Sequence, residues 1–117
     1  MRYTIAHEST KKPTRGGLHL RPGALIWDDS PIAVTYGLGV DVIGYALDIQ
    51  REDDGRITAE IEFGDEPWDE VRTWIFEVYG RLLVRTGDSV SEMELVEVRG
   101  ALSAGFPTDG MRFLRNT

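Results

Sequence analysis

Residues 42–63, VIGYALDIQREDDGRITAEIEF, decide the fold. Apolar side chains, Tyr45 among them, alternate with small or polar ones on both sides of the acidic run 52–55. Period-two alternation is typical of half-buried strands, and a turn-forming run between two of them indicates a β-hairpin. We therefore expect antiparallel pairing of 42–50 with 56–63. The residues expected to face the core are Ile43, Leu47, Ile49, Ile57, Ile61 and Phe63.

The acidic turn between these strands raises the question of a calcium site. Residues 52–55 place three carboxylates before a glycine. An EF-hand loop needs further oxygen ligands at set offsets and a closing Glu on a flanking helix, and the sequence lacks them. We therefore interpret the turn as structural, with Gly55 supplying a positive φ.

Short apolar segments separated by turn-forming residues precede the hairpin. Such spacing is typical of short strands joined by tight turns. The expected strands lie within 2–6, 18–20, 24–27 and 32–36. Between the first two, residues 9–17 carry three cations, Pro13 and two glycines, so they have no apolar face. We expect this segment to be a surface loop or arm.

The segment after the hairpin predicts the one helix of the chain. Six apolar side chains fall within an arc of roughly 100° when successive residues turn by about 100° each. They are Trp68, Val71, Ile75, Val78, Tyr79 and Leu82. Asp65 stands where an N-cap would be, and Gly80 is a stop signal that would place Leu82 in the next element, 81–85.

The fold class that follows is mainly β (α+β), a small antiparallel β-barrel or sandwich of about six or seven strands with one packed α-helix. Residues 90–102 supply a further strand, and a last strand is expected around 111–114. The chain has 117 residues, of which 41% are hydrophobic, and this is enough for a core. We therefore expect 1–117 to form a single domain.

Two aromatic residues of the predicted helix, Trp74 and Phe76, lie off its apolar stripe. Aromatic side chains outside a core face are enriched at protein interfaces, so both are candidate binding residues. The alternative is that 73–79 forms a strand, which would bury both side chains. The sequence leaves these two interpretations open.

Charge and composition limit the partners and the chemistry. Twenty acidic and thirteen basic residues give a net charge of −7, whose field repels nucleic acid and anionic membranes. A protein partner with a basic surface fits this charge, and self-association is a further option. The sequence has no cysteine, which excludes disulfides and thiolate chemistry. No apolar run resembles a signal peptide or a membrane span, so we expect a cytoplasmic protein.

No complete catalytic, metal or cofactor motif occurs in the sequence. The two histidines, His7 and His19, fall on separate predicted elements. The acidic pairs 28–29 and 69–70 are typical caps of turns and helix starts. Residues 36–40, YGLGV, have too few fixed positions for a phosphate-binding loop. We therefore expect neither a metal nor a cofactor.

The order of the central segments resembles a known family. The segments are 22–25 (PGAL), 30–34 (SPIAV), 42–49 (VIGYALDI), 52–61 (EDDGRITAEI) and 94–98 (ELVEV). They are similar to the N-terminal β-region of the tailed-phage prohead (capsid maturation) proteases, in which a Pro-led strand, an Ile-Gly hairpin, an acidic turn and a later strand follow in this order. The resemblance covers the middle third of the chain. It implies a phage-encoded protein with a protease-like β-barrel, located in the host cytoplasm.

The sequence departs from this family at the catalytic positions. The family's catalytic His follows the Pro-led strand, where this sequence has Thr35, Tyr36 and Gly37. For the family's serine, two registers are open. One supplies Ser103 from 102–106 (LSAGF), and the other places the serine position within 74–78, where no serine occurs. A serine without a base to take its proton is a poor nucleophile.

We therefore expect a non-enzymatic protein-binding module, acting as an accessory or host-interacting phage protein. One alternative is a minimal serine peptidase that uses Ser103, for which His19 is the residue to test as base. A third candidate is a structural virion or capsid-assembly subunit, which shares the sequence features of the binding module.

Overall fold

The computed structural model describes residues 2–8, 18–36, 41–64, 74–102 and 113–114. Within these ranges the chain forms nine β-strands and no helix. The strands are β1 (Arg2–His7), β2 (His19–Leu20), β3 (Leu25–Ile26), β4 (Ile32–Tyr36), β5 (Val42–Arg51), β6 (Arg56–Phe63), β7 (Trp74–Thr86), β8 (Ser89–Leu102) and β9 (Phe113–Leu114). The predicted strands before the hairpin, the strand over 90–102 and the last strand are confirmed. The predicted arm, 9–17, lies outside the described residues.

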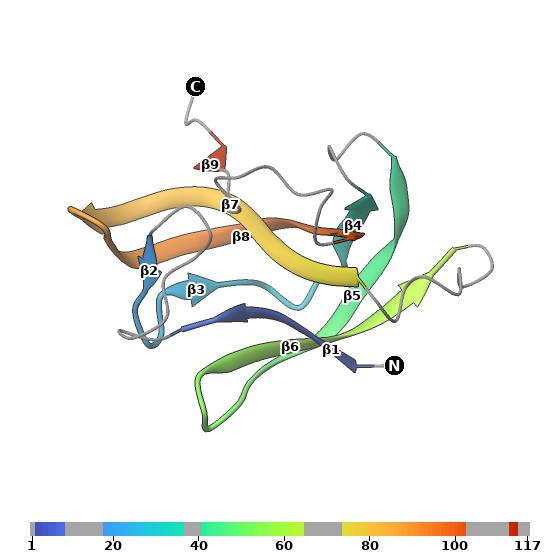
Figure 1. The fold of residues 1–117 in the computed structure, drawn as a ribbon, viewed down its shortest axis with the longest axis horizontal. Helices are drawn as coiled ribbons and strands as arrows, with labels where there is room; N and C mark the ends of the chain where they lie inside the picture. The colour runs from blue at the N-terminus through green and yellow to red at the C-terminus, as the bar shows by residue number, and fades with distance from the viewer. Residues whose placement is uncertain (1, 9–17, 37–40, 65–73, 103–112, 115–117) are drawn as a thin grey trace.

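All nine strands belong to one sheet, whose order is β1-β6-β5-β4-β8-β7-β9, with β2 and β3 also paired to β8. Strand β8 is antiparallel to β7 but parallel to β2, β3 and β4, so the sheet is mixed and not purely antiparallel as predicted. The sheet bends so that β1 lies near β7 (Figure 1). There the ring centroids of Tyr3 and Phe76 are 4.9 Å apart. The result is a nearly closed, barrel-like sheet.

The β5–β6 hairpin has the predicted antiparallel pairing. Its inner face is built from two rows of side chains across β4, β5 and β6, and the middle residue of each row is small. One row is Val34, Gly44 and Phe63, and the other is Ile32, Ala46 and Ile61. Inner side chains converge where a sheet curves, and small barrels fit them by alternating small and large residues. A Cβ at Gly44 would collide with the backbone of Glu62, so only glycine fits there.

Strand β5 departs from the predicted alternation at Asp48. Its φ of 49° is in the left-handed region, and the pairing with β6 shifts directly after Leu47. An extra residue in one strand reverses the face of the residues that follow it. The prediction that Leu47 faces the core is therefore wrong, because it lies opposite Glu60 on the outer face. The other residues predicted on the inner face do form or contact the core, namely Ile43, Ile49, Ile57, Ile61 and Phe63.

The predicted helix is wrong over 74–79, because these residues are the first part of β7, a strand of 13 residues. The alternative strand interpretation is confirmed there, while 65–73 lie outside the described residues. Both faces of this part of β7 are covered: Phe76 and Val78 belong to the core, and Tyr79 is buried on the opposite face. A strand buried on both faces is a continuous apolar run, which periodicity cannot distinguish from a buried helix.

One buried carboxylate, Glu8, joins the ends of three strands. Its side chain is 2% exposed and accepts hydrogen bonds from the backbone N–H groups of Gly23 (3.1 Å) and Leu25 (2.8 Å). Arg51 donates from Nε at 2.6 Å and from Nη2 at 3.0 Å, and its guanidinium lies 4.7 Å from the centroid of the Trp27 ring. The hydrogen bond to Glu8 raises the pKa of Arg51, which keeps this group charged. The junction thus fixes the ends of β1, β3 and β5.

Candidate functional site

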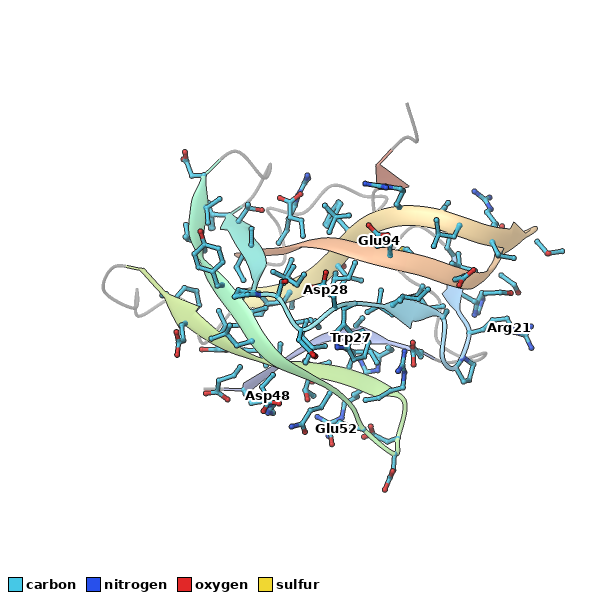
Figure 2. The ribbon with its side chains drawn as sticks, turned by 180° about the vertical axis from the view of Figure 1, so that it is seen from behind. Arg21, Trp27, Asp28, Asp48, Glu52 and Glu94 are labelled. Carbon is cyan, nitrogen blue, oxygen red and sulfur yellow. The ribbon has the colours of Figure 1, made fainter. Side chains whose placement is uncertain are left out.

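Acidic side chains surround the Glu8 junction on the outer surface. Figure 2 shows Trp27 and Asp28 between Glu94 on one side and Asp48 and Glu52 on the other. All four of these carboxylates have partners within the chain, and that of Asp28 accepts a hydrogen bond from the N–H of Ser30 at 2.9 Å. Asp48 pairs with Arg2 at 2.6 Å, Glu52 accepts a hydrogen bond from Thr58 at 2.8 Å, and Glu94 pairs with Arg81 at 3.9 Å. These acids are therefore engaged with other groups of the chain, and they do not by themselves define a site.

A more distinctive arrangement lies on the outer face of the sheet, over β6, β5, β4, β8 and β7. Directly opposite residues of neighbouring strands share a face, so the register defines rows of side chains. The first row is Glu62, Tyr45, Ala33, Glu97 and Tyr79, and the second is Val42, Thr35, Arg99 and Glu77. We call this set the outer-face rows. They are buried toward β7 and exposed toward β5 and β6.

The buried end of the outer-face rows is a polar network around Glu97. Thr35 Oγ1 donates to Glu97 Oε2 at 2.6 Å, and Arg99 donates from Nε and Nη2 to the same carboxylate, each at 3.1 Å. The guanidinium of Arg99, which is 7% exposed, lies 4.0 Å from the centroid of the fully buried Tyr79 ring. A buried ion pair needs such additional partners to offset its desolvation.

The network also holds the side chain of Thr35, a residue of β4. Its hydroxyl is buried and donates its proton to Glu97. Glu97 in turn accepts from Arg99. The hydrogen bond from Thr35 to Glu97 therefore links β4 and β8 through side chains as well as through their backbones.

The exposed end of the outer-face rows presents two large apolar side chains on the central strand β5. Val42 is 55% exposed and Tyr45 is 50% exposed. Across the strand pair, Tyr45 faces the exposed Glu62, and on the other side it faces the small Ala33. The inner face of β5 is occupied by Gly44 and Ala46, so packing of the core does not account for the tyrosine. Exposed aromatic rings with a polar rim are typical of protein contact surfaces.

The structure does not bring the sequence-predicted binding residues together on a surface. Phe76 is 7% exposed, and its ring packs against Tyr3, so it belongs to the core. Trp74 is the first residue of β7 and pairs with Leu102. Ser103, the weak catalytic candidate, lies outside the described residues.

Tyr45 and Val42 were missed because the alternating pattern counts every large apolar residue as a core residue. The signal that identifies Tyr45 is its two neighbours, Gly44 and Ala46. When the small residues of an alternating strand face the core of a curved sheet, the large ones face outward.

Metal and membrane features were also sought in the described part of the chain. No group of three or more His, Cys, Asp or Glu residues there could hold a metal ion. His19 lies on β2 and His7 on β1, two strands that do not pair with each other. Among the same residues, no helix has the length and apolar character needed to cross a membrane.

Comparisons of the chain with protein-family models, with curated proteins and with solved structures found no match. The features of the chain that bear on its function are therefore the geometry of the outer-face rows and the net charge of −7.

Proposed function

We propose that this chain is a non-enzymatic protein-binding module that contacts its partner through the exposed end of the outer-face rows. The observation that supports the proposal is the position of Tyr45. It is a half-exposed aromatic ring on the outer face of a strand whose inner face is already packed. Tyrosine gives a large contact area at a small entropic cost, because its side chain has only two rotatable angles. Val42 extends the apolar surface beyond it.

The charge of the chain supports a basic partner. The net charge is −7, and the exposed Glu62 lies directly opposite Tyr45. Opposite potentials on two surfaces speed their encounter and disfavour wrong partners. Association should therefore slow as the salt concentration rises, because the Debye length falls to about 8 Å at physiological ionic strength.

The resemblance to prohead proteases supports assigning the module to the phage accessory or host-interacting proteins. The polar network at Thr35 is the feature that favours binding over peptide hydrolysis in this proposal. Thr35 replaces the family's base, and its hydroxyl is already used in a hydrogen bond to Glu97.

Site-specific photo-crosslinking in the cells that express the gene tests the proposal. A benzophenone amino acid in place of Tyr45 should give a discrete protein adduct after irradiation. The matched control carries the same group in place of Val84, a 45% exposed residue of β7 that lies outside the outer-face rows. An adduct at position 45 and none at position 84 supports the proposal. No adduct at position 45, or the same adduct at both positions, contradicts it.

A further inference from the structure

The chain contains an internal example of how it binds an arginine side chain. Tyr79 and Glu97 lie directly opposite each other on the antiparallel strands β7 and β8. Arg99, two residues beyond Glu97, lies over the Tyr79 ring at 4.0 Å from its centroid and donates two hydrogen bonds to Glu97. The planar guanidinium can stack on a ring and bond a carboxylate at the same time, which an ammonium group does less well.

The same arrangement of strands recurs at Tyr45 and Glu62, but without the cation. These two residues lie directly opposite each other on the antiparallel strands β5 and β6, and both are exposed. The residue two positions beyond Glu62 is Gly64, whose N–H donates to the carbonyl of Ile43 at 2.9 Å. In the internal example, Arg99 lies opposite Glu77, which precedes Tyr79 by two residues. In the same way, Gly64 bonds to Ile43, which precedes Tyr45 by two residues. Gly64 therefore occupies the place that Arg99 has in the buried network.

Tyr45 and Glu62 have no cation of their own within the described residues. No ion pair involves Glu62 there, and no guanidinium lies over the Tyr45 ring. In the two arginine–aromatic contacts of the described residues, the cation also pairs with a carboxylate. Arg51 lies over Trp27 and pairs with Glu8. Arg99 lies over Tyr79 and pairs with Glu97.

We propose that Tyr45 and Glu62 together bind an arginine side chain of the partner protein, which takes the place that Arg99 takes over Tyr79. This inference rests on the proposed function and specifies the chemistry of the partner at one position. A single exposed cation–π contact changes affinity by about two- to five-fold, so the pair contributes orientation and choice of partner more than total affinity.

The most direct test uses a small arginine probe and the tyrosine ring signals of the intact protein. The chain has four tyrosines, and Tyr45→Phe assigns the signal of Tyr45 in a ¹H–¹³C spectrum. N-acetyl-arginine amide should shift the Tyr45 signal, whereas N-acetyl-citrulline amide, which is uncharged and of similar shape, should not shift it at matched ionic strength. Glu62→Gln should reduce the initial slope of the shift with probe concentration by about two- to five-fold.

A second variant supplies the cation from within the chain. Gly64→Arg places a guanidinium where the internal example has one, and the site can accept a side chain. Among the described residues, a Cβ there meets nothing closer than the carbonyl oxygen of Ile43 at 3.9 Å, and Gly64 does not have a positive φ. This variant should shift the Tyr45 signal without any probe and should no longer respond to the probe, whereas the matched control Gly64→Ser should respond like the wild type.

Three outcomes would overturn the inference: an equal response to the citrulline compound, an unchanged slope in Glu62→Gln, or a wild-type response in Gly64→Arg. If Gly64→Arg does not fold, Glu62→Gln decides alone. The outcomes also separate this inference from the proposed function. A partner that crosslinks at position 45 together with no response to the arginine probe refutes the arginine site and leaves the binding surface standing. A probe response without any crosslinked partner refutes the binding surface and leaves the arginine site standing.

Discussion

Removal of the Glu8 carboxylate should be among the most damaging single changes to this fold. The carboxylate accepts hydrogen bonds from two backbone N–H groups and from Arg51, and it lies at the ends of three strands. Glu8→Ala leaves the buried N–H of Leu25 and the partly buried N–H of Gly23 without an acceptor. Each unsatisfied buried donor costs about 1–3 kcal/mol.

The expected loss for Glu8→Ala is about 3 kcal/mol, the low end of the range of about 3–5 kcal/mol for breaking a buried ion pair. The low end applies because the Arg51 side chain is 42% exposed and can be rehydrated once its partner is gone. Glu8→Gln keeps one acceptor oxygen, so its loss should be smaller than that of Glu8→Ala. The measurement is urea unfolding followed by tryptophan fluorescence, in which the midpoint should fall by roughly 1–3 M for a slope of about 1–3 kcal/mol per M.

The matched control for this experiment is the exposed ion pair between Asp54 and Arg56. The two side chains are 59% and 45% exposed and lie 2.8 Å apart. Asp54→Ala should therefore lower the urea midpoint far less than Glu8→Ala does, because exposed ion pairs contribute little to stability. If Glu8→Ala lowers the urea midpoint no more than Asp54→Ala does, then Glu8 does not fix the ends of the strands, and the account of the junction is refuted.

Three further predictions follow from the core, from one tyrosine and from the missing base. Ile61→Ala should reduce the free energy of unfolding by about 2–5 kcal/mol, because Ile61 fills the inner face beside Ala46, and a change within error in chemical denaturation would mean that the face is wrong. Burial, and to a lesser extent the charge of Glu60, raises the pKa of Tyr3, so the folded state holds this proton more tightly than the unfolded chain does. The stabilisation that comes from this proton is complete below about pH 10 and is lost as the pH rises further. The urea midpoint of Tyr3→Phe should therefore fall less steeply above about pH 10 than that of the wild type. Parallel curves for the two proteins would contradict this prediction. The purified protein should not react with a fluorophosphonate probe, and labelling abolished by Ser103→Ala would favour the peptidase alternative, with His19→Ala as the next variant.

The hairpin could be predicted from the sequence because two independent signals agree. Period-two alternation on both sides and a turn containing Gly55 specify the same pairing, and Gly55 has the expected positive φ of 91°. Which side chains of β5 face the core could not be predicted equally well. The curvature of the closed sheet leaves room only for Gly44 and Ala46 inside, and this depends on β4 and β6 packing on both sides of β5.

The segment 74–79 was assigned to the wrong element for a related reason. Its residues WIFEVY are apolar except for Glu77. As part of β7 they pair with β8, β1 packs across this strand, and Phe76, Val78 and Tyr79 are buried. Such pairing is a property of the assembled sheet and leaves no local mark in the sequence. For the same reason, the sequence alone does not identify the contact surface at Tyr45. Tyr45 matches the pattern of a core residue until the position of its neighbours is known.

We propose that Tyr45 serves binding and not the fold. Tyr45→Thr tests it directly, because threonine keeps a high preference for strands and removes the ring. The measurement combines the free energy of unfolding with the calorimetric affinity for the partner identified by crosslinking. We predict a change in unfolding free energy within about 0.5 kcal/mol and a loss of affinity of roughly tenfold or more. A loss of about 2 kcal/mol or more in stability, with unchanged affinity per folded molecule, would contradict the claim.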